Sequence, residues 1–325
     1  MPQPPFMDDR RAERRRERAR QIQRRRRVAF GLFVLAFAAI AVAVVVGTSG
    51  GSSSSSTTAS QAASSSGTGH HHRRAQPLPG TETVGDHKAR REPVPILMYH
   101  VIGYVKPSTP NQELWVSPST FSAQMRALAR AGYHGVTLQR VYDAWHGSVE
   151  LPSQPVVISF DDGYYGQYRN ARPTLLRHGW PGELNLKLDN LADMGGVRNI
   201  KRMVADGWEI DDHTITHPDL TAVSADRLRY EIGTSRKRFH KLFGVPANFF
   251  CYPAGRYDQA VIDEVRNAGF KAATTTLFGY ARPGDTWTLA RVRVNRSDGV
   301  DGVLRNLRTL GADPNAAPTG SNTGE

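Results

Sequence analysis

Two adjacent carboxylates, Asp161 and Asp162, directly follow the apolar run at 156–160. A carboxylate at the carboxyl end of a buried strand is costly to hold there unless a metal ion or a bound substrate uses it. Because adjacent residues of an extended strand point to opposite faces, the two carboxylates need separate partners. One of them can therefore be a metal ligand while the other is a base.

Two histidines, His213 and His217, follow later in the chain with three residues between them. This spacing lets both imidazoles reach one ion from a helical turn or a wound loop. With one carboxylate they would form a His₂Asp ligand set that leaves a fourth position for water, as a hydrolytic metal site requires. An isolated pair with this spacing is often structural, but a strand-end Asp pair earlier in the chain makes the metal interpretation much stronger.

The amino-terminal part of the chain has the composition of a membrane anchor. The 325 residues carry a net charge of +12, and residues 1–27 supply +7 of it through eleven arginines set against four acidic residues. An uncharged apolar run follows at 28–46 and is long enough to span a bilayer as a helix. We therefore expect a basic cytoplasmic tail, a transmembrane signal anchor and no nucleic-acid binding. A cleaved signal peptide is the alternative, but the apolar run is longer than is usual for one.

The rest of the chain divides where the composition changes. Residues 47–92 are rich in Ser and Gly and nearly free of large apolar residues, which is typical of a flexible linker. We predict a folded catalytic domain over 93–312 and a disordered tail over 313–325. The domain should lie outside the cytoplasm, held at the cell membrane by a single pass, because no second apolar segment brings the chain back. Cys251 is the single cysteine, which excludes an internal disulfide.

Short apolar runs alternate with helical patterns from Pro93 onward, which indicates repeated strand-helix units around a mainly parallel sheet. The expected strands cover 95–99, 136–138, 155–160, 184–188, 208–210, 248–251, 270–274 and 289–294. Such units can close a distorted α/β barrel of about seven strands, whose active site would lie at the carboxyl ends of the strands. This arrangement places His100, Asp161 and His213 at one end of the barrel.

Two longer motifs contain the candidate residues: Ser-Phe-Asp-Asp-Gly at 159–163, and Gly-Trp-Glu-Ile at 207–210 followed by His-Thr-Ile-Thr-His-Pro at 213–218. They resemble the first two motifs of the polysaccharide deacetylases, carbohydrate esterase family four, whose domain is also called the NodB-homology domain. The resemblance covers roughly 93–310 and implies a distorted barrel, an acetylated glycan as substrate and one divalent ion, usually zinc. It also implies that Asp161 is the general base and that Asp162, His213 and His217 are the metal ligands.

The general acid of that family usually lies in a Leu-x-His segment near the C-terminus, and this chain has no convincing one. Instead, Leu-Met-Tyr-His at 97–100 resembles a rearranged branch that includes poly-N-acetylglucosamine deacetylases, in which the acid-bearing motif precedes the Asp pair. The first and last strands of a closed barrel are neighbours, so this permutation can leave the His in the same place. We therefore expect His100 to be the general acid. A hydrogen-bonded His at a strand end is the alternative.

The segment Phe-Cys-Tyr-Pro-Ala-Gly at 250–255 resembles the family's third motif, which commonly reads Arg-Pro-Pro-Tyr-Gly. Cys251 stands where the Arg would orient the base. Arg291 or Arg256 could replace that Arg, although each alone is more typical of an ordinary surface residue. The backbone N–H of Ala254 could still bind an oxyanion, because this contact needs no particular side chain.

Several aromatic residues could contact the substrate or, as is commoner after strand ends, pack in the core. They are Tyr164, Tyr165, Trp180, Tyr252 and Tyr257. Asp212 directly precedes His213 and could support a metal ligand.

These expectations combine into a membrane-anchored, zinc-dependent hydrolase that removes acetyl groups from an N-acetylated cell-wall or extracellular polysaccharide. The metal would polarise the acetamide carbonyl and lower the pKa of a bound water, Asp161 would accept the proton of the water, and His100 would protonate the leaving amine. Two alternatives stay open. One is an O-acetyl esterase on the same fold, and the other is a degenerate glycan-binding barrel without activity.

Overall fold

The structure is a computed structural model that describes residues 92–320. The predicted basic tail at 1–27, the transmembrane helix at 28–46 and all of the predicted linker except its last residue lie outside this range. None of the helices between residues 92 and 320 combines the length and the apolar character that a bilayer crossing needs.

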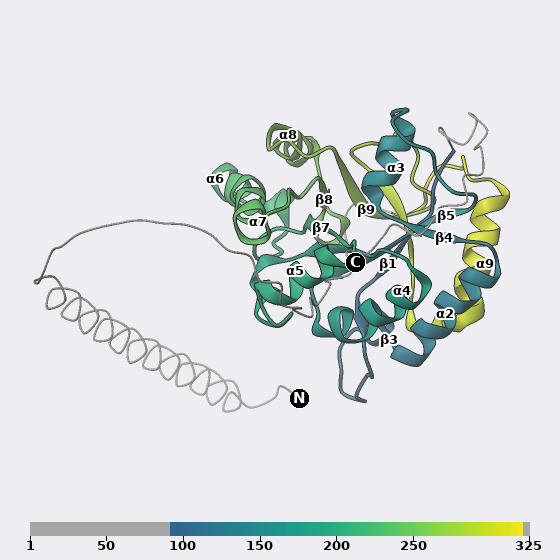
Figure 1. Ribbon diagram of the computed structural model, residues 1–325. Helices are drawn as coiled ribbons and strands as arrows, with labels where there is room; N and C mark the ends of the chain where they lie inside the picture. The colour runs from purple at the N-terminus through teal and green to yellow at the C-terminus, as the bar shows by residue number, and fades with distance from the viewer. Residues whose placement is uncertain (1–91, 321–325) are drawn as a thin grey trace, which may run out of the picture. The chain divides into compact units, whose positions relative to one another are not determined.

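Seven parallel strands form a closed barrel in the described part of the chain (Figure 1). They are β1 (Ile96–Tyr99), β5 (Pro155–Asp162), β6 (Glu183–Leu186), β7 (Glu209–Asp212), β8 (Phe249–Cys251), β9 (Ala272–Phe278) and β10 (Leu289–Arg293). The order around the barrel is β1-β10-β9-β8-β7-β6-β5, and pairing of β1 with β5 closes the ring. This confirms the prediction of an α/β barrel of about seven strands. β1 and β10, the first and last barrel strands along the chain, are neighbours. A His motif on the first strand can therefore lie in the same place as one on the last strand.

Helices connect the strands, and most of them lie around the outside of the barrel (Figure 1). They are α2 (Pro118–Arg130), α3 (Leu138–Trp145), α4 (Arg172–His178), α5 (Val197–Ala205), α6 (Ala225–Arg229), α7 (Ser235–Phe243), α8 (Gln259–Asn267) and α9 (Gly299–Ala312). The predicted cap of α2 is present, because the Ser117 side chain accepts the N–H of Thr120. A short strand, β4 (His134–Val136), extends the sheet beside the amino end of β5.

The segment after α2 differs from the sequence prediction. A strand was expected at 136–138, but β4 ends at Val136 and Thr137 caps the helix α3 by accepting the N–H of Arg140. The Leu138, Val141 and Ala144 side chains of α3 are buried, so a helical pattern was present but was too short to be distinctive. The predicted tail also differs in part, because Thr319 pairs with Phe278 in an antiparallel bridge.

The alternation of side chains along β5 explains where the chemistry lies. Ile158 and Phe160 face outward and belong to the large apolar cluster that contains Phe121 of α2. Val157 faces inward and packs with residues of α3 in a smaller cluster. Because the strand period is two, Asp161 continues the inward series at the carboxyl end of the strand. The inward series of β5 thus passes from the apolar Val157 through Ser159 to Asp161 at the rim of the barrel.

Candidate active site

Asp161 is buried in the rim of the barrel and is held by Arg291 of β10. The guanidinium donates from Nη1 to Oδ1 and from Nη2 to Oδ2 of Asp161, both at 2.8 Å, and its Nε donates to the carbonyl of Thr275 at 2.7 Å. Burial favours the neutral carboxyl, but the charge and hydrogen bonds of Arg291 outweigh it and hold the pKa of Asp161 well below its usual range. Asp161 is therefore ionised at every pH at which the fold would work.

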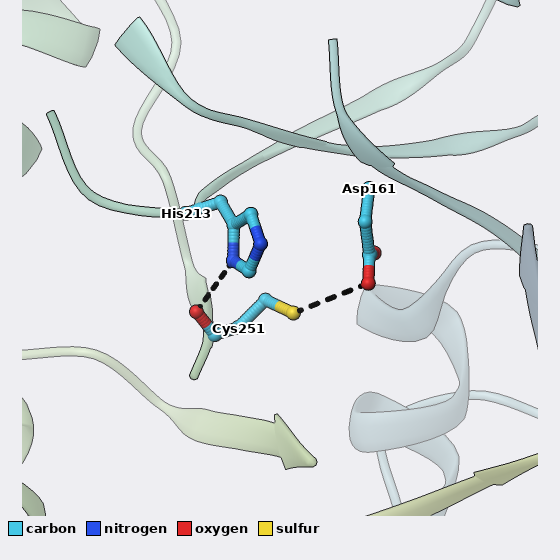
Figure 2. Close-up of side chains that lie close together, drawn as sticks. All are labelled: Asp161, His213 and Cys251. Atoms are coloured by element: carbon cyan, nitrogen blue, oxygen red, sulfur yellow. Dashed lines mark hydrogen bonds between the residues drawn. The ribbon is translucent and has the colours of Figure 1, made fainter. Parts of the chain in front are cut away.

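Two more side chains lie next to the carboxylate oxygens of Asp161. Asn185 of β6 donates to Oδ1 at 2.8 Å, and the thiol of Cys251 lies 3.8 Å from Oδ2 (Figure 2). Gln167 donates to the backbone carbonyls of both Asp161 and His100, so it ties the ends of β5 and β1 together. Sequence reasoning missed Asn185 and Gln167. For Asn185 the signal was available, because a polar residue on the inward face of a buried strand needs a partner.

Asp162 turns away from Asp161 toward the two histidines. Its backbone is left-handed, with φ of 74°, which aims the carboxylate over the rim. Oδ1 lies 3.6 Å from Nε2 of His213 and 3.8 Å from Nε2 of His217. One ligand atom from each of these three residues lies within 4.8 Å of the others. The two neighbouring carboxylates therefore have separate partners, and the three residues predicted as metal ligands lie together.

The orientation of His213 is set by its second nitrogen. Nδ1 lies 2.8 Å from the carbonyl of Cys251 (Figure 2). This leaves Nε2 directed at Asp162. A metal-binding His is commonly fixed in this way, with the nitrogen that does not bind held by a carbonyl. Burial opposes the charged form, yet the contacts with Cys251, Asp161 and Asp162 raise the pKa of His213 to about 10. Burial and the neighbouring His213 lower the pKa of His217 to about 4.

The loop between the histidines is left-handed at two residues that are not glycine, Thr214 (φ 67°) and His217 (φ 61°). Asp212 is fully buried and accepts the N–H of Thr214 and the hydroxyl of Ser235 at 2.8 Å each. Burial, the largest influence, raises the pKa of Asp212 to about 8 although these hydrogen bonds oppose the shift. The structure thus places Asp212 against the backbone of the ligand loop rather than against a ligand side chain.

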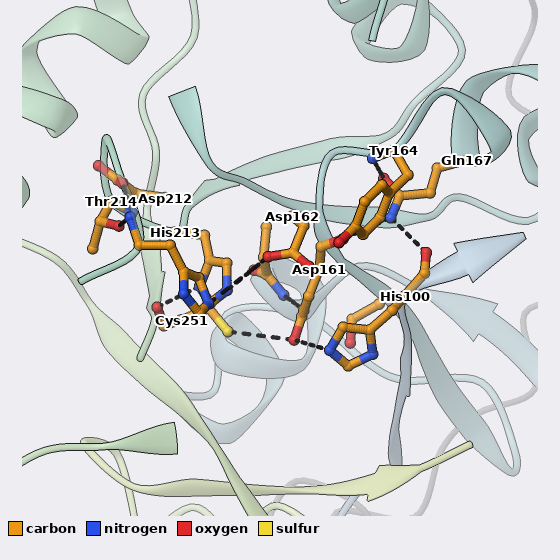
Figure 3. A network of polar contacts seen from close by, with 12 residues as sticks. His100, Asp161, Asp162, Tyr164, Gln167, Asp212, His213, Thr214 and Cys251 are labelled. Carbon is orange, nitrogen blue, oxygen red and sulfur yellow. Dashed lines mark hydrogen bonds and ion pairs between the residues drawn. The ribbon is translucent and has the colours of Figure 1, made fainter. Parts of the chain in front are cut away.

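His100 follows β1 and lies on the other side of Asp161 from the metal-ligand set (Figure 3). Its Nε2 lies 3.8 Å from Oδ2 of Asp161, and its side chain is 14% exposed. Burial lowers the pKa of His100, against the two carboxylates, which act to raise it. A buried carboxylate, a possible metal site and a possible proton donor therefore occupy one end of the barrel.

Comparisons with known proteins agree with this arrangement. Residues 148–273 match the family model of polysaccharide deacetylases. Residues 148–273 therefore belong to a polysaccharide deacetylase domain. YxkH of Bacillus subtilis (strain 168), named as a polysaccharide deacetylase, is 29% identical over 205 residues, which cover 62% of this chain and 71% of that protein. The chain is therefore an enzyme of the deacetylase class of hydrolases.

Two further proteins are similar to the chain. The poly-beta-1,6-N-acetyl-D-glucosamine N-deacetylase of Escherichia coli (strain K12) is 35% identical over 66 residues, which cover 20% of this chain and 10% of that protein. The Streptococcus pyogenes deacetylase PplD, solved in complex with acetate, superposes with a TM-score of 0.62 at 27% identity and covers 66% of this chain and 98% of its own.

The segment 250–255, which resembles the third deacetylase motif, has no Arg, and the structure brings Arg291 rather than Arg256 to Asp161. Arg256 pairs with Asp219 at 3.2 Å. Ala254 has a left-handed backbone, with φ of 52°, in the short helix η7 (Pro253–Gly255) that follows β8. A single Arg from the last strand thus stands in for the Arg that the motif lacks.

The aromatic candidates separate into buried and exposed residues. Trp180 lies at the amino end of β6, where a Cβ on Gly135 would come within 2.6 Å of its ring, so it is a packing residue and not part of the site. Tyr252 is fully buried and belongs to the apolar cluster, so it does not reach substrate. Tyr257 is half-buried, with its ring 5.0 Å from that of Tyr252.

Tyr164 and Tyr165 lie nearer the ligands. Burial, together with the carboxylate of Asp162, raises the pKa of Tyr164. Tyr165 is 48% exposed, which leaves its ring open to solvent. Of the predicted aromatic residues, these two and Tyr257 are the ones whose placement allows contact with a bound polymer.

Proposed function

We propose that the chain is a metal-dependent N-deacetylase of a polysaccharide built from N-acetylglucosamine-type units. The observation that carries the proposal is the juxtaposition of an ionised, Arg-held Asp161 with the set Asp162, His213 and His217. A carboxylate base beside a His₂Asp donor set is what hydrolysis of an unreactive amide requires.

The donor set fits a zinc-like ion. Two imidazole Nε2 atoms and one carboxylate oxygen converge, and His213 is already oriented by its bond to the Cys251 carbonyl. Two nitrogens and one oxygen from the protein are a ligand set that catalytic zinc sites use. When bound, the ion would supply Lewis-acid activation of the acetyl carbonyl and of a water.

The chain's own residues account for the proton transfers. Asp161 accepts a proton from the attacking water on Oδ2, since Oδ1 is already shared by Asn185 and Arg291. His100, at 3.8 Å from Oδ2, donates a proton to the nitrogen of the departing amine. The backbone N–H of Ala254 is assigned to the oxyanion, because its left-handed turn follows β8 at the same end of the barrel.

The substrate class is proposed from chemistry and from one relative. A dedicated proton donor matters more for an amine than for an alcohol leaving group, which favours an amide over an ester. The Escherichia coli relative is named for the N-deacetylation of poly-beta-1,6-N-acetyl-D-glucosamine, and the same class of glycan is proposed here.

We also propose that the enzyme acts outside the cytoplasm from a membrane anchor. The support is the Arg-rich block at 1–27, the apolar run at 28–46 and the Ser-rich linker that follows. Protease added to intact cells should then release the domain, whereas a cytoplasmic domain would be protected.

The test is acetate release by the purified full chain loaded with zinc. Acetylated chitooligosaccharide, poly-N-acetylglucosamine and wall glycan should each be offered beside acetylated xylan, which reports esterase activity. Asp161→Asn should lower turnover by roughly 10²–10⁴-fold with its zinc content unchanged, and His100→Asn should do the same through the leaving-group step. Absence of acetate from every substrate, with zinc bound, would contradict the function. Release from xylan alone would make the enzyme an esterase.

A further inference from the structure

The N–H groups of the loop that carries the second histidine ligand are bound by side chains. Each N–H of the four-residue segment 214–217 is donated to a side-chain oxygen, at 2.8 or 2.9 Å. Asp212 takes the first, Glu231 takes the second and third, and the hydroxyl of Thr214 takes the fourth. The segment is neither helix nor strand, so its shape depends on these oxygens.

Glu231 contributes the largest share and comes from outside the motif. It lies on the π-helical turn η6 (Tyr230–Thr234) between α6 and α7, and its side chain is fully buried. Oε2 accepts the N–H groups of Ile215 and Thr216 at 2.9 Å, and Oε1 accepts the Thr216 hydroxyl at 2.7 Å. Arg227, 45% exposed, pairs with Oε1 at 2.6 Å and balances the charge.

The loop needs these hydrogen bonds because its backbone is strained at Thr214 and at His217. Thr214 and His217 both have positive φ, a conformation that costs energy for residues other than glycine and persists only where the surroundings enforce it. His217 is also the more exposed of the two histidines, at 32% against 2% for His213, so fewer packing contacts restrain it. Its place beside Asp162 therefore depends on the loop.

We propose that Glu231 is a positioning residue of the metal site, which sets the affinity for the ion by holding the loop that presents His217 to Asp162. The inference rests on the proposed function, since it requires that an ion binds Asp162, His213 and His217. Glu231 touches none of these side chains and takes no part in proton transfer. Instead, Glu231 orders the loop before the ion binds, so less conformational entropy is lost on binding.

The test compares Glu231→Gln with the wild type in the full chain, using zinc itself as the probe. The amide keeps the size of the side chain, but its NH₂ group replaces one of the two accepting oxygens. Because NH₂ cannot accept a hydrogen bond, at least one hydrogen bond from the loop is lost. Zinc affinity, measured by competition with a chromogenic chelator, should fall about 10–100-fold. At saturating zinc, the fold-loss in turnover should be much smaller than the fold-loss in zinc affinity.

A thermal measurement separates positioning from a merely structural role. Zinc raises the Tm of the wild type by an amount that depends on its affinity. If Glu231 positions the site, the variant should show a smaller rise at equal zinc. If the carboxylate only stabilises the fold, Tm should drop equally with and without zinc and the affinity should not change, which overturns the proposal.

Two milder variants keep the test decisive if Glu231→Gln does not fold. Thr216→Val removes the hydroxyl that donates to Oε1 and accepts from Arg227, and it leaves both N–H bonds of Glu231, so zinc affinity should fall less than in Glu231→Gln. Arg227→Ala removes the partly exposed partner of Oε1 and should likewise weaken zinc binding. Wild-type affinity in both variants would overturn the role of Glu231. Wild-type protein that binds no zinc would overturn the metal-dependent function together with it.

Discussion

Two groups of buried polar residues lie inside the same barrel, and they differ in what surrounds their carboxylates. The catalytic group, defined as Asp161, Asn185 and Arg291, lies toward the carboxyl ends of the strands. The acidic cluster, defined as Glu183, Glu209 and Asp211, begins one pleat lower, since Glu183 is two residues before Asn185 on β6. One ligand atom from each residue of the acidic cluster lies within 4.8 Å of the others.

The difference between the groups is the presence of a cation in contact. Arg291 binds both oxygens of Asp161, whereas both oxygens of Glu183 and Oδ2 of Asp211 have no hydrogen-bond partner within residues 92–320. Burial, and then the nearby Glu209, raise the pKa of Glu183 well above its usual value. Burial alone does not decide the state of a carboxyl group, because a correctly placed guanidinium reverses its effect.

Removing the Arg291 guanidinium should leave Asp161 without a cation in contact, like the carboxylates of the acidic cluster. We expect it to be the most damaging single change in either group. Arg291→Met leaves Asp161 buried and unpaired, so we expect a loss of stability of about 3–5 kcal/mol and near-complete loss of turnover. Arg291→Lys keeps the charge but loses the fork that grips both oxygens, so turnover should fall by about 100-fold with the fold retained.

The measurement is acetate release alongside denaturant unfolding and zinc content for both variants. Zinc content should stay at the wild-type level, because Arg291 contacts none of the ligand side chains. Turnover of Arg291→Lys equal to that of the wild type would mean that charge alone, and not the two-point grip, supports the base.

From the sequence, Asp161, Asp162, His213 and His217 could be predicted to lie together, because they belong to short motifs with chemically specific spacing. Asp161 and Asp162 are adjacent, and His213 and His217 share one loop. The barrel could be predicted for a similar reason, since each strand and helix has its own local pattern. Element boundaries were less accurate, as α3 shows, because a cap at Thr137 and three apolar residues are a weak signal.

From the sequence, Arg291 was one of two candidates for the support of Asp161 and could not be chosen over Arg256, because closure of the barrel brings the supporting residues from distant strands. Arg291 lies 130 positions from Asp161, and only the ring closure through β1 and β10 brings the two together. A signal existed: Leu289, Arg291 and Arg293 alternate on one face of a predicted strand, and a charged residue in the middle of a buried strand needs a partner. Glu231 is similar, since it follows the apolar Leu228 by three positions and therefore shares its buried helical face.

Neutralising the acidic cluster should have a smaller effect than changing Arg291, and on stability rather than turnover. The carboxyl of Glu183 titrates near 4.5 when unfolded and at higher pH when folded, facing Glu209, Asp211, Asp161 and Arg291. At a pH between the unfolded-state and folded-state pKa of Glu183, the native state binds more protons than the unfolded state. The free energy of unfolding therefore falls as pH rises, by up to about 1.4 kcal/mol per pH unit. Glu183→Gln should flatten this slope and be more stable than the wild type at alkaline pH.

Denaturant unfolding from acidic to alkaline pH measures this slope. Asp226→Asn is the control, since Asp226 has a 92% exposed side chain and its removal should leave a curve parallel to that of the wild type. A Glu183→Gln curve parallel to that of the wild type would mean that Glu183 is ionised in the fold and that some cation compensates it.

Replacing the thiol in the catalytic group should have the smallest effect. Cys251 occupies the place of the family's usual Arg, with Sγ 3.3 Å from Nη2 of Arg291 and 3.8 Å from Asp161. Since the guanidinium already grips both carboxylate oxygens, Cys251→Ser should change kcat/KM by less than about 1 kcal/mol, roughly fivefold. A loss as large as that of Arg291→Lys would show that the thiol is itself an essential partner of the base. The near-neutral result instead assigns the electrostatic support of Asp161 to Arg291, because serine keeps a small polar group in the same place.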